Sequence, residues 1–187
     1  MKSKSILLLG GSGTLGNAIR IKFTKNKVFR IFSPSSNKIN FNNKNVEKNL
    51  TKILKENNFD IIINCAGVFG FNDKDFHSIL NVNTYSNWLI LKYLIYNVPN
   101  KKTKIIFIGS SAYNQPRKNY ILYTASKAAL NSIFKSANDY FIKSKKIKFF
   151  ILHPKRFKSN MTNIFDEKSF KTKSSTIANK IYRIVMK

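Results

Sequence analysis

Several ingredients are scarce in this sequence, and each shortage excludes a class of protein. Cysteine occurs once, as Cys65, which rules out a disulfide framework and a cysteine-based metal site. We therefore expect a reducing cytoplasm and no bound metal. Apolar runs such as 6–9 are far shorter than the roughly 20 residues that cross a bilayer. The N-terminal apolar run is also too short for a secretory signal, so we expect neither a membrane segment nor a signal peptide.

Acidic residues are scarce as well, since 8 Asp and Glu stand against 34 Lys and Arg, for a net charge of +26. Such a charge suggests a polyanionic partner. However, 29 lysines against 5 arginines, together with 24 Asn and 24 Ile, match the residues that AT-rich codons encode. Nucleic-acid binders favour clustered arginines, whereas these lysines are scattered from Lys2 to Lys187. We interpret the charge mainly as genome bias and expect no nucleic-acid partner.

Apolar residues suffice for one core, because they make up 43% of a chain of 187 residues. Short apolar runs alternate with segments of helical periodicity, which predicts a doubly wound parallel sheet with helices on both faces. The predicted strands are 5–9, 28–32, 60–64, 104–109 and 149–153, and the predicted helices are 15–25, 46–56, 76–96, 123–142 and 176–186. We expect a single three-layer α/β domain over 1–187, with a mobile loop over 166–175.

The first motif is a glycine-rich turn between the first predicted strand and the first predicted helix. Gly10, Gly13 and Gly16 have GxxGxxG spacing there. Glycines allow the backbone to approach a pyrophosphate closely, and the amides and dipole of a helix N-terminus favour the anion. A plain tight turn is the alternative interpretation, and the position between strand and helix argues against it.

The second motif combines a serine, Ser110 or Ser111, with Tyr123 and Lys127. Tyr123 and Lys127 are four residues apart and share one face of a helix. An ammonium beside a phenol favours the phenolate and lowers the pKa of the tyrosine. This trio therefore suits a proton donor and acceptor that works near neutral pH, with the serine left open between the two candidates.

With these motifs in order, the chain resembles the short-chain dehydrogenases/reductases over about 5–161, which implies a Rossmann-like fold. The GGSGTLG turn resembles the cofactor glycine motif of that family, and the segment 64–67 resembles its NNAG motif. Asn83 falls where the family has the asparagine of its catalytic tetrad. Ser110 lies thirteen residues before Tyr123, the usual family spacing, and is therefore preferred to Ser111 as the catalytic serine.

The segment after the last predicted strand also resembles the family. His153-Pro154 followed by 159–161 is similar to the family's PG segment and TDM turn, where a hydroxyl contacts the nicotinamide carboxamide. Lys155 replaces the glycine after the proline, but the hydroxyl of Ser159 is kept. The chain ends soon after this turn, so we expect the family's last strand and much of its substrate-covering region to be absent or reduced.

The resemblance implies an NAD(P)-dependent oxidoreductase that transfers a hydride between the nicotinamide and a carbonyl or alcohol. In that mechanism Tyr123 transfers the proton. Lys127 lowers the pKa of Tyr123 and binds the ribose of the cofactor. Ser110 steadies the substrate oxygen, and Asn83 holds a relay water. The residues implied to bind the cofactor are Gly10, Ser12, Gly13, Thr14, Leu15, Gly16, Asn64, Ala66, Gly67, Tyr123, Lys127, Pro154 and Ser159.

The loop after the second predicted strand bears on the choice of cofactor. It offers the hydroxyls of Ser33 and Ser35 and no carboxylate, with Lys38 nearby. A carboxylate there would bind the ribose 2′-hydroxyl and repel a 2′-phosphate, so its absence favours NADP, with NAD as the second choice. Asn40 and Phe41 replace the acidic and aliphatic residues that the family usually has near adenine.

The scarce arginines suggest the kind of substrate. Arg117 and Arg156 follow two predicted strands at their carboxyl ends, where ligands bind in a doubly wound sheet. Their planar forks match phosphate or carboxylate, so we expect a small anionic substrate such as a nucleotide-linked sugar or another phosphorylated metabolite. A homo-oligomer is a further expectation.

Two other functions compete with this interpretation. A catalytically silent dinucleotide-binding regulator could have the same fold, but such proteins tend to lose the tyrosine and lysine that this chain keeps. A basic nucleic-acid-binding protein could use Tyr113, Tyr120 and Tyr123, near Arg117 and Lys118, as a stacking patch. The catalytic spacing explains Tyr123 better.

Overall fold

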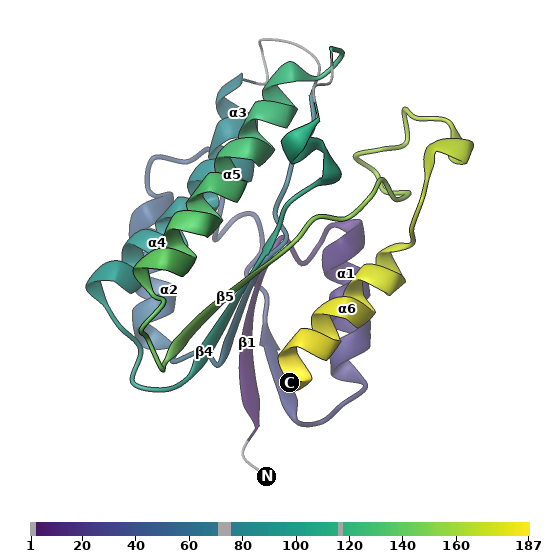
Figure 1. Ribbon diagram of the computed structural model, residues 1–187. Helices are drawn as coiled ribbons and strands as arrows, with labels where there is room; N and C mark the ends of the chain where they lie inside the picture. Colours follow the sequence, from purple (N-terminus) through teal and green to yellow (C-terminus); the bar gives the residue numbers. More distant parts are fainter. Residues whose placement is uncertain (1–2, 71–75, 116–117) are drawn as a thin grey trace.

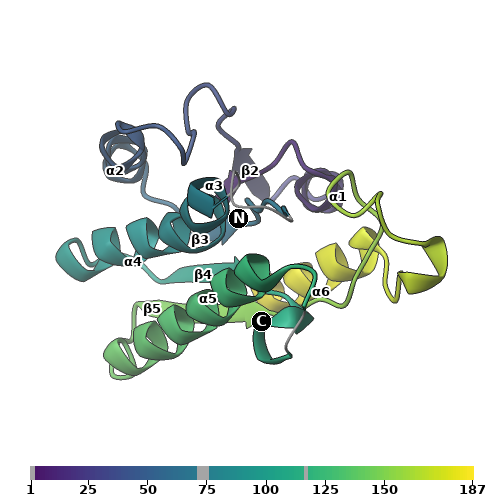
Figure 2. The ribbon, with the colours of Figure 1, turned by 90° about the horizontal axis from the view of Figure 1, so that it is seen from above.

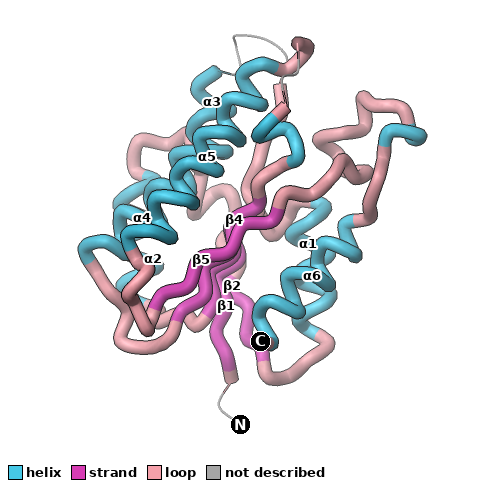
Figure 3. The backbone as a smooth tube through the Cα atoms, in the orientation of Figure 1, coloured by secondary structure: helices cyan, strands magenta, loops and turns pink. Residues whose placement is uncertain are grey.

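The computed structural model describes residues 3–70, 76–115 and 118–187 and places five strands in one parallel sheet. The strands are β1 (Lys4–Leu9), β2 (Phe29–Phe32), β3 (Ile61–Asn64), β4 (Thr103–Ile108) and β5 (Ile147–Leu152). Their order in the sheet is β2-β1-β3-β4-β5, and Figure 3 draws the strands in magenta between the helices. The direction of winding therefore reverses between β1 and β3, the place where open parallel sheets bind their ligands.

Helices cover both faces of the sheet. They are α1 (Thr14–Thr24), α2 (Val46–Glu56), α3 (Phe76–Leu80), α4 (Ser86–Tyr96), α5 (Ile121–Tyr140) and α6 (Ser174–Met186). Helices α1 and α6 pack on one face, and α2, α4 and α5 pack on the other (Figures 1 and 2). The predicted three-layer, Rossmann-like α/β fold is confirmed.

Consecutive residues of the central strands are apolar, because both faces of the sheet are buried. In β1, Ile6 and Leu8 point into the core beneath α1 and α6, whereas Leu7 and Leu9 join the core beneath α2, α4 and α5. All four side chains are at most 1% exposed. Successive residues of a strand face opposite sides of the sheet, so this one apolar run contributes to both cores.

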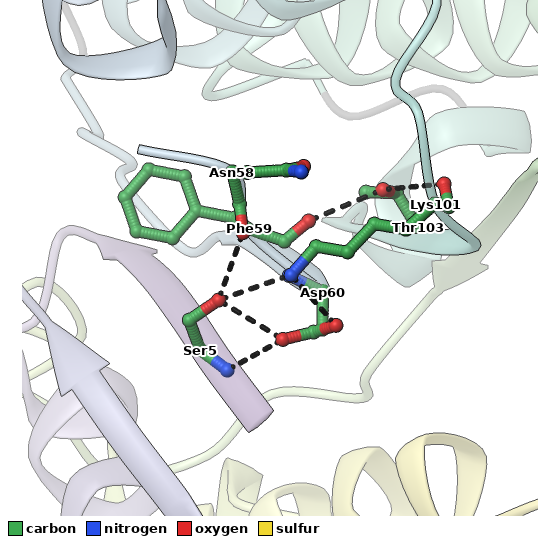
Figure 4. A network of polar contacts seen from close by, with 6 residues as sticks. All are labelled: Ser5, Asn58, Phe59, Asp60, Lys101 and Thr103. Atoms are coloured by element: carbon green, nitrogen blue, oxygen red, sulfur yellow. Dashed lines mark hydrogen bonds and ion pairs between the residues drawn. The ribbon is translucent and has the colours of Figure 1, made fainter. Parts of the chain in front are cut away.

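The amino ends of the central strands are joined by a polar network at the edge away from the glycine turn (Figure 4). The Ser5 backbone amide donates to the Asp60 carboxylate at 2.7 Å, and the Lys101 ammonium lies 2.8 Å from the same group. Thr103 donates its hydroxyl to the Phe59 carbonyl at 3.1 Å. Desolvation alone would raise the pKa of Asp60, but the bonds from Lys101 and Ser5 outweigh it and lower that pKa. The network thus fixes β1, β3 and β4 relative to one another.

The predicted helix over 76–96 is divided in the structure. Helices α3 and α4 are separated by a π-helical turn over Asn81–Tyr85. Within this turn Asn83 is fully buried and hydrogen bonds to the backbone of Val68, outside the helix. The extra residue in the turn aims this amide at the loop after β3. The other predicted elements are present, with ends that differ by up to two residues.

The part of the chain after β5 adds no sixth strand to the sheet among the described residues. It makes an isolated bridge between Phe157 and Thr172 and a short 3-10 turn over Glu167–Ser169 before α6 begins. The mobility predicted for 166–175 stays a prediction. Within the described residues, no helix has the length and apolar character that a membrane crossing needs.

Candidate functional site

A cavity of about 930 Å³ lies at the carboxyl ends of the strands. Its lining comes from the glycine turn, the loops after β2, β3, β4 and β5, and the start of α5. The charged side chains among the described lining residues are Lys127, Lys155, Arg156 and Lys171, with no carboxylate. The cavity is therefore electropositive and suited to an anionic ligand.

The glycine turn closes tightly onto neighbouring backbone. Gly10 has a φ of +74°, and a Cβ there would lie 2.5 Å from the backbone nitrogen of Ala66. A Cβ on Gly16 would lie 2.2 Å from the Gly10 carbonyl oxygen. Glycine is needed at both positions, and the turn leads directly into α1, whose N-cap is Gly13. Backbone amides at a helix N-terminus are thus presented to the cavity, and the predicted residues Ser12, Thr14 and Leu15 also line it.

The segment after β3 is supported by a buried amide. Asn64 accepts a hydrogen bond from the Ala66 amide at 3.1 Å and donates to Ser86 and Asn87, each at 2.9 Å. Asn64 is only 2% exposed, so it shapes the turn from behind, whereas Ala66 and Gly67 line the cavity. These bonds connect the end of β3 to α4.

Ser110 and Tyr123 meet in the cavity. Ser110 follows β4, its hydroxyl accepts from the Ala112 amide at 3.1 Å, and its side chain lies near enough to the Tyr123 phenol to lower the pKa of that phenol. Desolvation raises the pKa of Tyr123, Ser110 lowers it, and the nearby Tyr120 raises it again. The structure thus pairs Ser110 with the phenol, as the preference over Ser111 requires, while the catalytic role of Ser110 stays a prediction.

The predicted lowering of the Tyr123 pKa by Lys127 is wrong for this arrangement. The Lys127 ammonium lies over the Tyr123 ring, 5.8 Å from its centroid, and donates to the Ile108 carbonyl at 3.0 Å. Burial dominates for both groups, raising the pKa of Tyr123 and lowering that of Lys127 to about 8. The two side chains do share one face of α5, as their spacing predicted.

A close approach fixes the loop that carries Ser110. A Cβ on Gly109 would lie 2.4 Å from Nδ1 of His153, and this nitrogen is 3.2 Å from the Ser110 carbonyl oxygen. Tyr113 stacks on the imidazole with ring centroids 4.0 Å apart. Desolvation, aided by the charge of Lys127, lowers the pKa of His153 against the opposing effect of the Ser110 bond. A neutral imidazole thus supports the loop.

Asn83 does not line the cavity in the way that its implied role suggested. Its amide accepts from the Val68 nitrogen at 2.9 Å and donates to the Val68 oxygen at 3.0 Å and to the Ser126 hydroxyl at 3.1 Å. The backbone carbonyl of Asn83 accepts a hydrogen bond from the side-chain amide of Asn87 at 3.0 Å. Both ends of the side chain are therefore engaged with protein, and its role with a relay water stays a prediction.

Other predicted residues differ in how they meet the cavity. Pro154 and Ser159 line it, and the Ser159 hydroxyl lies 3.0 Å from that of Thr162. From the loop after β2, Pro34 and Ser36 line the cavity. Ser33 lies instead against Gly11, where a Cβ would come within 2.0 Å of its hydroxyl oxygen. Cofactor contacts of Ser33 and Ser35 therefore stay predictions.

Aromatic residues that the sequence analysis missed complete the site. Phe69 and Phe165 line the cavity beside Tyr120 and Tyr123. They are far apart in the chain and belong to no motif, so no sequence signal marks them. Arg156 lies among them, whereas Arg117 lies outside the described residues. The tyrosines weighed as a nucleic-acid patch are used elsewhere, because Tyr120 and Tyr123 line the cavity and Tyr113 stacks on His153, as described above.

Comparison with known proteins agrees with this architecture. A family model described as short chain dehydrogenase matches residues 39–169. No match was found among curated protein sequences. A 3-ketoacyl-(acyl-carrier-protein) reductase from Brucella melitensis, solved with NADH, is 17% identical with a TM-score of 0.84, covering 98% of this chain and 91% of its own. A short chain dehydrogenase from Burkholderia cenocepacia, solved with NADP, is 12% identical with a TM-score of 0.84, covering 100% and 85%. These structures establish the shared fold.

Proposed function

The chain belongs to the short-chain dehydrogenase family, and on this premise we propose that it is an NAD(P)-dependent oxidoreductase that interconverts a carbonyl compound and an alcohol. The observation that carries the proposal is the meeting of Ser110, Tyr123 and Lys127 in one cavity with a glycine turn that exposes backbone amides. Neighbours of the same fold were solved with NADP and NADH, which supports a nicotinamide cofactor.

The residues present fit such a cofactor. Gly10 and Gly16 let the turn pack closely against neighbouring backbone, and the N-terminus of α1 offers amides to a pyrophosphate. Lys127 would hold the ribose, and Pro154 and Ser159 would contact the nicotinamide. When bound, the cofactor supplies the hydride that adds to the carbonyl carbon. The protein residues then have to bind the substrate, orient it and deliver a proton.

Tyr123 is proposed to deliver that proton. Because desolvation raises its pKa, the phenol is protonated at neutral pH and can donate to the substrate oxygen as the carbonyl π pair moves onto it. The Ser110 hydroxyl holds the same oxygen through a hydrogen bond. Lys127, with a pKa of about 8, lies over the Tyr123 ring, so its proposed part is to hold the ribose rather than to lower the pKa of the phenol.

The decisive experiment replaces Tyr123 by phenylalanine. We expect Tyr123→Phe to lower kcat by about 10²–10⁴-fold, because the proton donor is lost, and to leave cofactor affinity nearly unchanged. Tyr140→Phe is the matched control, since Tyr140 is 63% exposed on α5. Steady-state assays over a carbonyl panel and cofactor titrations by fluorescence supply the measurements. Activity of Tyr123→Phe equal to that of the wild type would contradict the role proposed for Tyr123. Cofactor binding by the wild type without turnover of any substrate would favour the silent regulator.

We further propose that NADP binds more tightly than NAD and that the substrate is anionic. The loop 33–38 has no carboxylate to repel a 2′-phosphate, and Ser36 in this loop lines the cavity. Titrating both cofactors against the wild type and Ser36→Asp checks the preference: the new carboxylate should weaken NADP far more than NAD. Equal or tighter binding of NAD by the wild type contradicts it. Support for an anionic substrate comes from the cationic lining, of which Arg156 is part.

A further inference from the structure

One wall of the cavity is built from three aromatic rings. Phe69 follows β3, Tyr120 precedes α5 and Phe165 lies after β5, and we call these three the aromatic wall. The Phe69 ring centroid is 5.2 Å from that of Tyr120 and 5.6 Å from that of Phe165. Edge-to-face packing of rings from three separate segments gives a continuous apolar surface.

This wall adjoins the proposed proton donor. The ring centroid of Phe69 is 4.9 Å from that of Tyr123, and the centroid of Tyr120 is 6.3 Å from it. A substrate whose carbonyl oxygen reaches the Tyr123 hydroxyl therefore has the rest of its body beside the wall. Hydroxyl groups of a sugar would lose hydration there without gaining partners from the rings, whereas a flat apolar body would gain contact area.

Arg156 is held at the same wall by two contacts. Its guanidinium carbon lies 3.8 Å from the centroid of the Phe165 ring, and Nη2 donates to the Tyr120 hydroxyl at 3.1 Å. The four ion pairs of the described residues do not include Arg156. A stacked guanidinium has five N–H donors in a fixed fork, and the bond to Tyr120 uses one of them. The fork is thus fixed in orientation and keeps donors for an anion.

We propose that the substrate is an anionic carbonyl compound with a planar apolar body, whose carboxylate or phosphate binds Arg156 and whose body packs on the aromatic wall. The inference rests on the reductase function proposed above and narrows its substrate class. Tyr120 links the two halves of the site, because it contacts both Arg156 and Tyr123. Arg156 then determines which carbonyl compounds are accepted, while proton transfer depends on other residues.

The test compares pairs of aromatic ketones in which one member has an anionic group and the other does not. Benzoylformate is paired with benzoylformamide, and phenacyl phosphate with 2-hydroxyacetophenone, so that carboxylate and phosphate are tested separately. A charge-assisted hydrogen bond corresponds to roughly 10- to 100-fold in kcat/KM, and we expect the wild type to prefer at least one anion by that factor. Arg156→Gln should remove the preference, because it should raise KM for the anion about 10- to 100-fold more than KM for the neutral partner.

Control variants separate this role from a structural one. Arg156→Lys keeps the charge but loses the planar fork, so it should retain only part of the preference. Tyr120→Phe frees the guanidinium and should raise KM for the anion more than it lowers kcat. Lys145→Gln removes one exposed charge near the amino end of β5 and should change nothing.

The outcomes distinguish the two levels of the argument. Equal losses for anionic and neutral partners in Arg156→Gln would mean that Arg156 merely holds the segment after β5, and this would overturn the inference alone. Preference of the wild type for both neutral partners would do the same. Failure of the wild type to reduce any carbonyl with either nicotinamide would overturn the proposed function and the inference together.

Discussion

Lys127 carries a positive charge in a place where burial opposes it. Lys127 is 4% exposed. Its ammonium donates a hydrogen bond to the Ile108 carbonyl, which is uncharged and so does not balance the positive charge. Desolvation lowers its pKa from 10.5 to about 8. The unfolded chain therefore binds this proton more tightly than the folded chain does, and the ammonium costs folding free energy at neutral pH. The buried charge of this candidate site residue thus weakens the fold.

Lys127→Met should be inactive but more stable than the wild type at pH 7. Removing the buried charge gains at most about 3 kcal/mol, and losing the bond to Ile108 returns about 1 kcal/mol. The advantage should be full below pH 8 and fade as pH rises from 8 to above 10.5, because the wild-type lysine then becomes neutral in both states. Urea unfolding at pH 7 and pH 10 measures the difference. A variant that is less stable than the wild type at pH 7 contradicts the argument.

The candidate site residues were predictable from the sequence where their geometry is local. Tyr123 and Lys127 share a helix face because they are four apart, and both line the cavity. The sequence correctly predicted that Arg156 lies at the carboxyl ends of the strands. Its stack on Phe165 and its bond to Tyr120 depend on how separate loops pack together. Nor could the sequence give the sign of the Tyr123 pKa shift, because desolvation is set by the packed surroundings.

At the scale of elements, the junction of β1 and α1 depends on Gly16 more than on Gly13. Gly16→Ala places a Cβ 2.2 Å from the Gly10 oxygen and 2.6 Å from the Gly11 Cα, and backbone atoms cannot yield as a side chain would. We expect a loss of about 1–3 kcal/mol in unfolding free energy, despite the better helix propensity of alanine. Thermal unfolding followed by circular dichroism measures it.

Gly13→Ala is the matched control for this prediction. The nearest atom to its Cβ is the Gly10 oxygen at 3.5 Å, an ordinary contact, and the φ of Gly13 is −72°. Only the N-cap preference changes, so we expect a loss of less than about 1 kcal/mol. Equal losses in the two variants would show that the close packing of Gly16 against the turn is not what stabilises this junction.

Strands and helices were predicted well where hydrophobic periodicity is strong. Each of the five strands lies within a predicted apolar run or overlaps one, because burial on both faces leaves little room for polar residues. The π-helical turn over Asn81–Tyr85 was not predictable. It shifts the helix by one residue, which the apolar pattern tolerates, and it contains Asn83, whose bonds to the distant residue Val68 depend on tertiary packing.

At the scale of the whole molecule, the net charge of +26 acts against compactness. Folding brings like charges together, and only 8 acidic residues are available to offset 34 basic ones. We expect Tm to rise by several degrees between about 10 mM and 500 mM NaCl, since the Debye length shortens from about 30 Å to a few ångströms. Replacing exposed Lys143 and Lys145 by glutamate should flatten this salt dependence. A Tm that does not respond to salt in the wild type would refute the prediction.

The position of Asn83 makes the two ends of the cavity thermodynamically reciprocal. Its amide holds both backbone groups of Val68, next to Gly67, and also the hydroxyl of Ser126, three residues after Tyr123 on α5. A ligand that orders the loop after β3 therefore also orders the start of α5. Linkage requires the converse to hold by the same factor, so a cofactor that tightens substrate binding is itself tightened equally by the substrate. One buried amide thus connects the loop beside Gly67 with the helix that carries Tyr123.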